Sequence, residues 1–285
     1  MLTHSPPVSV RWQCAASLSR THHREQFRIR ASTKDESTDS PQPLLTRRRL
    51  GVCGCCCATA LGGAALLKSP LYARFEAHVL ATGMESYETA LRERKTELFK
   101  QLQGVESLLE VGVGGGPNLR YYPDSVCTLA AVEPNDASFR PYLERNAAQF
   151  APRVQLSLLR GVGEALPVAD ASMDAVVCTL VLCSVQDPLR VLSEVARVLK
   201  PRGRFLFVEH VAALRGESGL RLAQTLLDPL QQAIAGGCHL TRDTGALMRS
   251  QAGHDARFSR LEMESFSIPG LSVIAPHVAG IAYKA

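Results

Sequence analysis

Residues 108–119 read Leu-Leu-Glu-Val-Gly-Val-Gly-Gly-Gly-Pro-Asn-Leu, and the rest of the chain is organised around them. The short apolar start is bounded by glycines, as in a buried parallel strand, and Gly112, Gly114 and Gly116 then turn the chain sharply toward a helix. A side chain at these positions would strain the turn or keep a ligand away from the backbone. The stretch therefore predicts a strand, a bare loop and a helix start that bind a nucleotide-like cofactor.

The spacing of the glycines separates two classes of cofactor. A dinucleotide-binding loop has the pattern G-x-G-x-x-G, whereas this chain has G-x-G-x-G with Pro117 where the third glycine would stand. This argues against a nicotinamide cofactor. Glu110 stands two residues before the first glycine, and the pattern E-x-G-x-G-x-G resembles the first motif of the seven-strand S-adenosylmethionine methyltransferases. A glycine-rich turn that binds nothing is the alternative.

The composition favours one globular domain with an added leader. Of the 285 residues, 46% are hydrophobic, enough to bury one sizeable core. Residues 1–50 hold nine Lys or Arg against four Asp or Glu, and this surplus equals the formal net charge of +5 of the whole chain. Basic and acidic residues therefore cancel beyond residue 50, and we expect no nucleic-acid partner.

The first 73 residues have the composition of targeting segments. Residues 1–45 are rich in Ser, Thr, Arg and His and poor in acids, which indicates a disordered transit peptide and a chloroplast location. Residues 46–73 resemble a twin-arginine or thylakoid-type signal, because three arginines precede an uncharged run of 18 residues, 50–67. That run is at the lower limit for a membrane span. It is either a cleaved signal or a membrane anchor, so the stroma, the thylakoid membrane and the lumen all stay open.

The nine cysteines indicate no disulfide framework. Four of them crowd into the uncharged run with no His or paired C-x-x-C at zinc-ligand spacing. Small apolar filling is therefore the simpler interpretation of this group and metal binding the minor one: Cys53, Cys55, Cys56 and Cys57. Most of the later cysteines stand in apolar surroundings that suit buried thiols.

From residue 74 to residue 285 the chain alternates between helical and strand patterns, which predicts an α/β domain with a doubly wound sheet. Ligands of such sheets bind at the carboxyl ends of the strands. After the first strand and its glycine loop, further strands are expected at 128–132, 154–159, 174–182 and 204–209, and helices at 85–102, 141–150 and 187–199, with a turn at 200–203.

Several residues at that edge are cofactor candidates. Glu133 stands about 20 positions beyond the glycine loop, where a carboxylate can accept hydrogen bonds from both ribose hydroxyls; an ordinary charged strand end is the alternative. Residues 162–167 resemble the methyltransferase segment that flanks adenine. Glu110 and the glycine-loop backbone would hold the methionine end, and Leu180 would lie beneath the sulfonium. The full set is Glu110, Gly112, Gly114, Gly116, Glu133, Pro134, Gly163, Glu164, Ala165 and Leu180.

Residues 85–285 resemble one group within these enzymes, the thiol methyltransferases of the methyltransferase-like seven group. The segments that carry this resemblance are 174–185, 198–201, 209–212, 237–242 and 276–280. It implies a Rossmann-like seven-strand sheet, mostly parallel with an antiparallel last strand, and S-adenosylmethionine as cofactor. Three positions depart from the family pattern without removing a functional side chain: Gly115, Pro117 and Arg202.

The resemblance also implies a small alkyl or aryl thiol as methyl acceptor. A thiol must lose its proton, because an alkyl thiol titrates near ~8.5 and the thiolate is the nucleophile. His210 ends the fifth strand on the acceptor side and is the expected catalytic base, although a structural histidine is the alternative. No metal is expected. Weaker candidates for the acceptor pocket are Cys183, Cys238, Arg242 and His277.

Two other functions stay open at this point. The first half of the domain equally resembles quinone and menaquinone methyltransferases, so a prenylquinone ring carbon is a second candidate acceptor. A cofactor-binding assembly or regulatory protein without catalysis is the third hypothesis. Residues 237–242 and 276–280, in the carboxyl-terminal third of the chain, favour the thiol group.

Overall fold

A computed structural model describes residues 69–254 and 256–285. The predicted transit peptide and the uncharged run at 50–67 lie outside the described residues. Within the described ranges, no helix is both long and apolar enough to cross a lipid bilayer.

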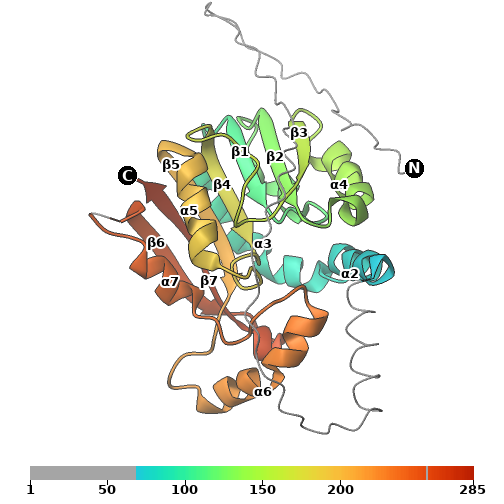
Figure 1. The fold of residues 1–285 in the computed structure, drawn as a ribbon, viewed down its shortest axis with the longest axis vertical. Coiled ribbons are helices and arrows are strands. Elements are labelled where there is room, and N and C mark those ends of the chain that lie inside the picture. The colour runs from blue at the N-terminus through green and yellow to red at the C-terminus, as the bar shows by residue number, and fades with distance from the viewer. Residues whose placement is uncertain (1–68, 255) are drawn as a thin grey trace, which may run out of the picture. The chain divides into compact units, whose positions relative to one another are not determined.

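Seven strands form one sheet in the order β3-β2-β1-β4-β5-β7-β6 (Figure 1). The neighbours from β3 to β5 are parallel, whereas β7 runs antiparallel to both β5 and β6. The expected fold class, a doubly wound and mostly parallel sheet with an antiparallel last strand, is confirmed. The strands are β1 Ser107–Val111, β2 Thr128–Glu133, β3 Gln155–Arg160, β4 Met173–Thr179, β5 Leu199–His210, β6 Phe258–Ser267 and β7 Pro276–Lys284.

Two apolar clusters bury the two faces of the sheet, because neighbouring strand residues point to opposite sides. Leu109 and Val176 pack with the buried face of one helix, α5, whereas Leu108 and Ala175 pack with Phe99 and other residues near α3 and α4. The helices are α2 Pro70–Thr82, α3 Glu85–Phe99, α4 Asp136–Phe150, α5 Pro188–Val198, α6 Ser218–Ile234 and α7 Thr244–Ser250, with short 3-10 helices η1 Lys100–Leu102, η2 Pro117–Tyr121 and η3 Ser272–Ile274.

The sequence predicted the start of a helix after the glycine loop. The structure has only the short 3-10 helix η2 there, and no α-helix begins at this point. Tyr122 is extended, with ψ of 132°, because it precedes Pro123 and a residue before proline avoids the helical region. The helix after β2 begins at Asp136, five residues before the predicted start, and Pro141 lies inside it. Burial of Phe139 on its first turns supports this earlier start.

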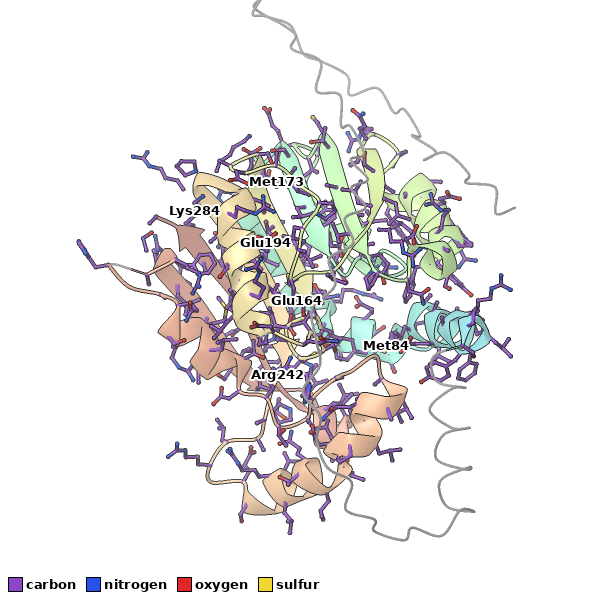
Figure 2. The ribbon with its side chains drawn as sticks, viewed as in Figure 1. Met84, Glu164, Met173, Glu194, Arg242 and Lys284 are labelled. Carbon is purple, nitrogen blue, oxygen red and sulfur yellow. The ribbon has the colours of Figure 1, made fainter. Side chains whose placement is uncertain are left out.

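The strand β5 includes the residues that were predicted as a turn before it. It begins at Leu199, and Arg202 takes a left-handed conformation with φ of 63°. The register with β4 shifts between Met173 and Ala175, so this part of β5 is irregular. Figure 2 shows Met173, where β4 begins, at one end of the sheet and Arg242 and Glu164 toward the other.

The helix α2 extends the described domain beyond its predicted start at residue 74. Ser69 caps this helix by accepting a hydrogen bond from Tyr72 N at 3.1 Å, and Ala77 on the helix is fully buried. The carbonyl of Ala73 accepts a hydrogen bond from Asn135 Nδ2 at 3.1 Å. A boundary at residue 74 therefore falls inside α2.

Candidate functional site

The glycine loop after β1 has the backbone conformation that only glycine adopts easily. Gly112, Gly114 and Gly116 have φ of 68°, 52° and 77°. A Cβ on Gly112 would lie 2.6 Å from Val181 Cγ2, and one on Gly116 would lie 2.7 Å from Leu119 Cδ1. The loop therefore brings bare backbone to the carboxyl end of the sheet.

Glu133 ends β2 beside this loop. Its Oε2 accepts a hydrogen bond from Gly114 N at 3.0 Å, and its Oε1 accepts one from Asn135 N at 3.1 Å. Burial raises the pKa of this carboxyl group, and the two N–H donors oppose the rise. Each oxygen has a second lone pair, so the carboxylate can still accept from two ribose hydroxyls. Pro134 directly follows it at the strand end.

Glu110 is fully buried and its carboxylate is held by the segment that follows the glycine loop. Asn118 Nδ2 donates to Oε1 at 2.8 Å and the Tyr122 hydroxyl donates to Oε2 at 2.5 Å. Burial raises its pKa to about 7, although both hydrogen bonds lower it. Asn118 Oδ1 is buried and has no partner among the described residues. The sequence interpretation missed Asn118 and Tyr122, because only the folded η2 returns them to Glu110.

The predicted adenine-flanking segment is fixed to α5. Glu164 Oε1 accepts hydrogen bonds from the backbone N–H groups of Gln186 and Asp187 at 2.9 and 3.2 Å, so this carboxylate caps the chain before the helix. A Cβ on Gly163 would lie 3.1 Å from Val191 Cγ2, which explains the glycine by packing. Ala165, which follows Glu164, is exposed.

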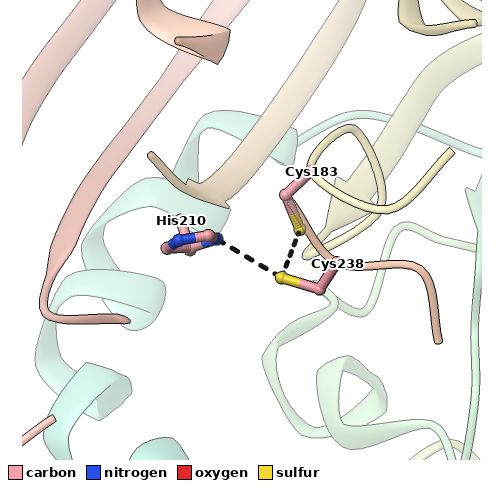
Figure 3. A group of neighbouring side chains, drawn as sticks. All are labelled: Cys183, His210 and Cys238. Atoms are coloured by element: carbon pink, nitrogen blue, oxygen red, sulfur yellow. Dashed lines mark hydrogen bonds between the residues drawn. The ribbon is translucent and has the colours of Figure 1, made fainter. Parts of the chain in front are cut away.

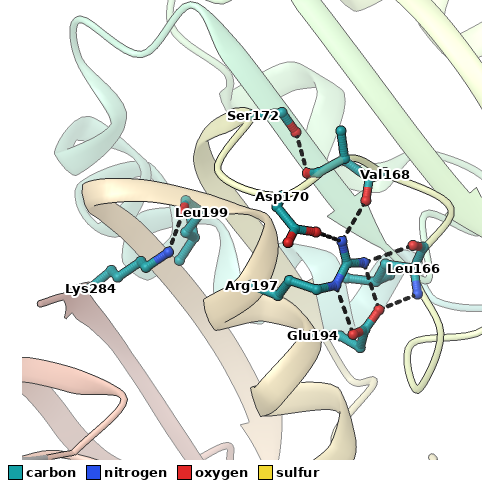
Figure 4. A network of polar contacts seen from close by, with 9 residues as sticks. Leu166, Val168, Asp170, Ser172, Glu194, Arg197, Leu199 and Lys284 are labelled. Carbon is teal, nitrogen blue, oxygen red and sulfur yellow. Dashed lines mark hydrogen bonds and ion pairs between the residues drawn. The ribbon is translucent and has the colours of Figure 1, made fainter. Parts of the chain in front are cut away.

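Arg197 on α5 holds the residues that follow Ala165 (Figure 4). Its guanidinium donates to the carbonyls of Leu166 and Val168 at 3.0 and 2.8 Å and pairs with Glu194 and Asp170. Leu166 N in turn donates to Glu194 Oε2 at 2.9 Å. The network holds the segment after residue 165 against α5, and with it the edge of the expected adenine site.

The loop after β4 is held by a buried carboxylate that the sequence interpretation did not assign to this task. Glu209 accepts from Val181 N at 3.0 Å and from Cys183 N at 3.1 Å, and burial raises its pKa to about 7. Leu180 has φ of 58°, which explains why β4 ends at Thr179 rather than at the predicted residue 182. Glu209 therefore shapes the loop that carries Leu180.

His210, the expected base, lies in a group with two cysteines (Figure 3). Its Nδ1 is 3.5 Å from Cys238 Sγ, and Cys238 Sγ is 3.9 Å from Cys183 Sγ. The donor atoms of the three residues all lie within 4.8 Å of one another, close enough to hold a metal ion. One proton shared by the sulfurs lowers the pKa of the Cys238 thiol and raises that of Cys183.

The other two pocket candidates have structural partners. His277 accepts from or donates to the Tyr87 hydroxyl through Nε2 at 3.0 Å, and its Nδ1 lies 2.9 Å from the Ala275 carbonyl oxygen. Burial lowers its pKa to about 4. Arg242 donates to the carbonyls of Leu182 and Val185 at 2.6 and 2.8 Å, so it clamps the loop after β4.

Comparison with known proteins identifies the family. Residues 109–207 match the family model described as a methyltransferase domain. Over 223 residues the chain is 36% identical to thiol S-methyltransferase TMT1B of Rattus norvegicus. The matched region covers 75% of this chain and 88% of that relative. The chain belongs to the thiol S-methyltransferase family. A member of this family is an S-adenosylmethionine-dependent methyltransferase, and this chain is one.

Two further comparisons bear on the family's fold and its other relatives. A match of 125 residues, 31% identical, links the chain to the ubiquinone/menaquinone biosynthesis C-methyltransferase UbiE of Methylobacterium nodulans, over 42% of this chain and 46% of that one. The solved geranyl diphosphate methyltransferase in complex with SAM has the same fold, with a TM-score of 0.54 and 15% identity, over 78% of this chain and 95% of that one.

The described residues fit S-adenosylmethionine at the carboxyl ends of β1 and β2. The left-handed glycines leave the loop free of side chains there, and Glu133 keeps acceptor capacity on both oxygens. The buried, unpartnered Asn118 Oδ1 is a further acceptor next to Glu110, suited to an ammonium group. The expected cofactor is therefore the one that the family uses.

Proposed function

We propose that this chain transfers the methyl group of S-adenosylmethionine to a small thiol. The observation that carries the proposal is a group of three side chains: His210 at the end of β5, Cys183 in the loop after β4 that also holds Leu180, and Cys238 after α6. Ligands of doubly wound sheets bind at these strand ends. The relationship to thiol S-methyltransferase TMT1B supports a thiol as acceptor.

The bound cofactor supplies a methyl group on a positively charged sulfur. The residues of the chain then have to orient the acceptor in line with that methyl group and to keep water out, and orientation of this kind contributes about 7 to 11 kcal/mol in ideal intramolecular cases. We propose that Glu133 and Asn118 hold the ribose and methionine parts, and that Ala165 with its neighbours borders the adenine. Leu180, partly buried at the end of β4, would form the floor beneath the sulfonium.

The acceptor thiol must lose its proton at this place. His210 is the side chain proposed for that task, because its ring lies at the end of β5 and is 2% exposed. Its Nε2 has no hydrogen-bond partner among the described residues. Glu209 does not assist it directly, since both carboxylate oxygens accept from the backbone of residues 181 and 183.

The test is incubation of the purified protein with labelled S-adenosylmethionine and a panel of acceptors. Alkyl and aryl thiols should be methylated at sulfur, and matched alcohols should not react. Methylation of a reduced prenylquinone but of no thiol would replace this proposal by ring-carbon methylation. Cofactor binding without turnover on either class would leave an assembly or regulatory role.

We also propose that residues 1–45 direct the protein to the chloroplast and that residues 50–67 bring it to the thylakoid membrane or lumen. The support is compositional: a basic leader followed by three arginines and an uncharged run. A fusion of residues 1–73 to a fluorescent protein should enter plastids. If the uncharged run is an anchor, the imported protein will stay in the membrane fraction after alkaline extraction; release into the soluble fraction contradicts an anchor.

A further inference from the structure

The geometry points to a zinc site formed by Cys183, His210 and Cys238, with its fourth position open for the acceptor thiol. This inference rests on the proposed thiol acceptor. In it, His210 binds the metal that activates the thiol, instead of acting as the base that takes the thiol's proton. The sequence predicted no metal. The expectation is revised because the fold brings together three soft or borderline ligands from separate parts of the chain.

Two of the three distances between the ligand atoms match a tetrahedral zinc ion. Zinc bonds of about 2.3 Å to sulfur and about 2.0 Å to nitrogen place two sulfur ligands about 3.8 Å apart and a sulfur and a nitrogen about 3.5 Å apart. The two sulfurs here are 3.9 Å apart, and Cys238 Sγ is 3.5 Å from His210 Nδ1. The third pair, from Cys183 to His210, lies within 4.8 Å.

The backbone holds each cysteine in place independently of a metal. Cys183 N donates to Glu209 Oε2 at 3.1 Å, and the Cys183 carbonyl accepts from His239 N at 2.9 Å. The latter bond ties the loop after β4 to the segment that carries Cys238. Gly237 allows this approach, because a Cβ there would lie 2.9 Å from the Ser184 carbonyl oxygen. Such outer contacts are what fixes ligands at metal sites.

His210 lacks the contacts of a structural histidine. It is buried, and the only hydrogen-bond partner of its ring among the described residues is the Cys238 sulfur, at Nδ1, while its Nε2 has no partner. Buried polar groups of structural residues are normally satisfied. His277, its neighbour across β7, shows the satisfied case, with Tyr87 and Ala275 as partners. The ring of His210 is therefore not held by structural hydrogen bonds of this kind, and its Nδ1, which faces Cys238, is the atom that would bind the metal.

Three protein ligands leave a tetrahedral ion with one open position, which distinguishes catalytic from structural zinc sites. In the described part of the chain no fourth His, Cys, Asp or Glu joins the group. A thiol that enters this position loses its proton to solvent, and the bound sulfur keeps the electron pair. That pair forms the new bond to the methyl carbon as the carbon–sulfonium bond breaks, so thiol and S-adenosylmethionine give thioether, S-adenosylhomocysteine and one proton.

Metal binding is tested on the full chain, purified under reducing conditions, stripped with a chelator and titrated with Zn²⁺. We expect about one high-affinity zinc per chain, and Co²⁺ in its place should show tetrahedral absorption with thiolate charge transfer. Cys183→Ser, Cys238→Ser and His210→Ala should each bind at least about 100-fold more weakly. Cys127→Ser, outside the group, is the matched control and should bind like the unchanged protein.

The cysteines of the uncharged run need their own control, because they are themselves thiol ligands. A variant with serine in place of Cys53, Cys55, Cys56 and Cys57 should still bind about one zinc ion per chain. Loss of zinc in this variant, or a different resident metal, overturns the assignment. A Cys183–Cys238 disulfide in the protein isolated under non-reducing conditions, with no metal bound by the reduced form, also overturns it.

The acceptor position is tested by adding an alkyl thiol to the Co²⁺-loaded chain. The thiol should change the charge-transfer spectrum, and the matched alcohol should not. Thiol methylation should fall at least about 100-fold on metal removal and return with Zn²⁺. Equal methylation by the metal-free chain contradicts the zinc inference and leaves the thiol function intact, with His210 as a free base. Zinc binding without methylation of any thiol contradicts the proposed function instead.

Discussion

His210 and His277 pair in register across β5 and β7 with ring centroids 6.2 Å apart, yet only His277 has a partner for each ring nitrogen. Both residues are buried. Their difference comes from what lies beyond the sheet: Tyr87 on α3 reaches His277, whereas Cys238 after α6 reaches His210. His277 is thus part of the packing, and His210 is available for chemistry.

The first prediction concerns the ribose contact. Glu133→Gln should weaken S-adenosylmethionine binding by about 2 kcal/mol, roughly 30-fold, because charged hydrogen bonds to the hydroxyls are lost. Titration calorimetry measures this. Glu144→Gln, on the exposed side of α4, is the control, and thermal unfolding shows whether the loop survives the loss of the Gly114 and Asn135 contacts. Unchanged affinity in Glu133→Gln would remove Glu133 from the cofactor site.

The second prediction is a pH dependence of stability that comes from Glu110. Its pKa is raised from 4.5 to about 7 by burial, so the folded state binds the proton more tightly than the unfolded state. The stability from this proton is fully present below about pH 4.5 and is lost as the pH rises through about 7, a change of about 3 kcal/mol. Glu110→Gln should lack this change.

The measurement is urea unfolding of both proteins between about pH 4.5 and pH 8. The difference in unfolding free energy between the unchanged chain and Glu110→Gln isolates Glu110, since other titrating groups such as Glu209 contribute to both curves. Parallel curves across this range would show that Glu110 keeps an ordinary pKa. Bound S-adenosylmethionine should flatten the difference if its ammonium group favours the ionised carboxylate.

The third prediction concerns the start of the domain. A chain that begins at Ser69 should fold and bind cofactor without the leader. A chain that begins at Arg74 should also fold but be less stable by about 1 kcal/mol, because α2 loses the Ser69 cap and its first turn. Ser69→Ala in the longer chain separates the cap from the rest. Failure of the Ser69 chain to unfold cooperatively would show that earlier residues belong to the fold.

The fourth prediction is that Arg242 holds the loop after β4, on the acceptor side of the site, and does not contact the cofactor. Arg242→Ala leaves the carbonyls of Leu182 and Val185 without their donor and should cost about 2 kcal/mol of stability. The Michaelis constant for the thiol should rise, while the cofactor dissociation constant should stay the same. Arg249→Ala, exposed on α7, is the control. A large loss of cofactor affinity in Arg242→Ala would contradict this division of roles.

The sequence by itself determined the family fold and predicted much of the proposed cofactor site. Local rules suffice for these features: a positive φ requires glycine at 112, 114 and 116, an apolar run bounded by turns predicts a buried strand, and a carboxylate at the end of β2 suits a ribose. Each of these signals lies within a few consecutive residues, so it can be seen before the chain folds.

Only the tertiary structure decided which side chains meet. Asn118 and Tyr122 reach Glu110 because η2 folds back over β1, and Glu209 bonds to the loop after β4 because β5 lies beside that strand. Cys183, His210 and Cys238 belong to three segments separated by 27 and 28 residues in the chain. Contacts at such separation are set by sheet order and loop packing, which no local pattern encodes, and so two scattered cysteines and a histidine come within 4.8 Å of one another.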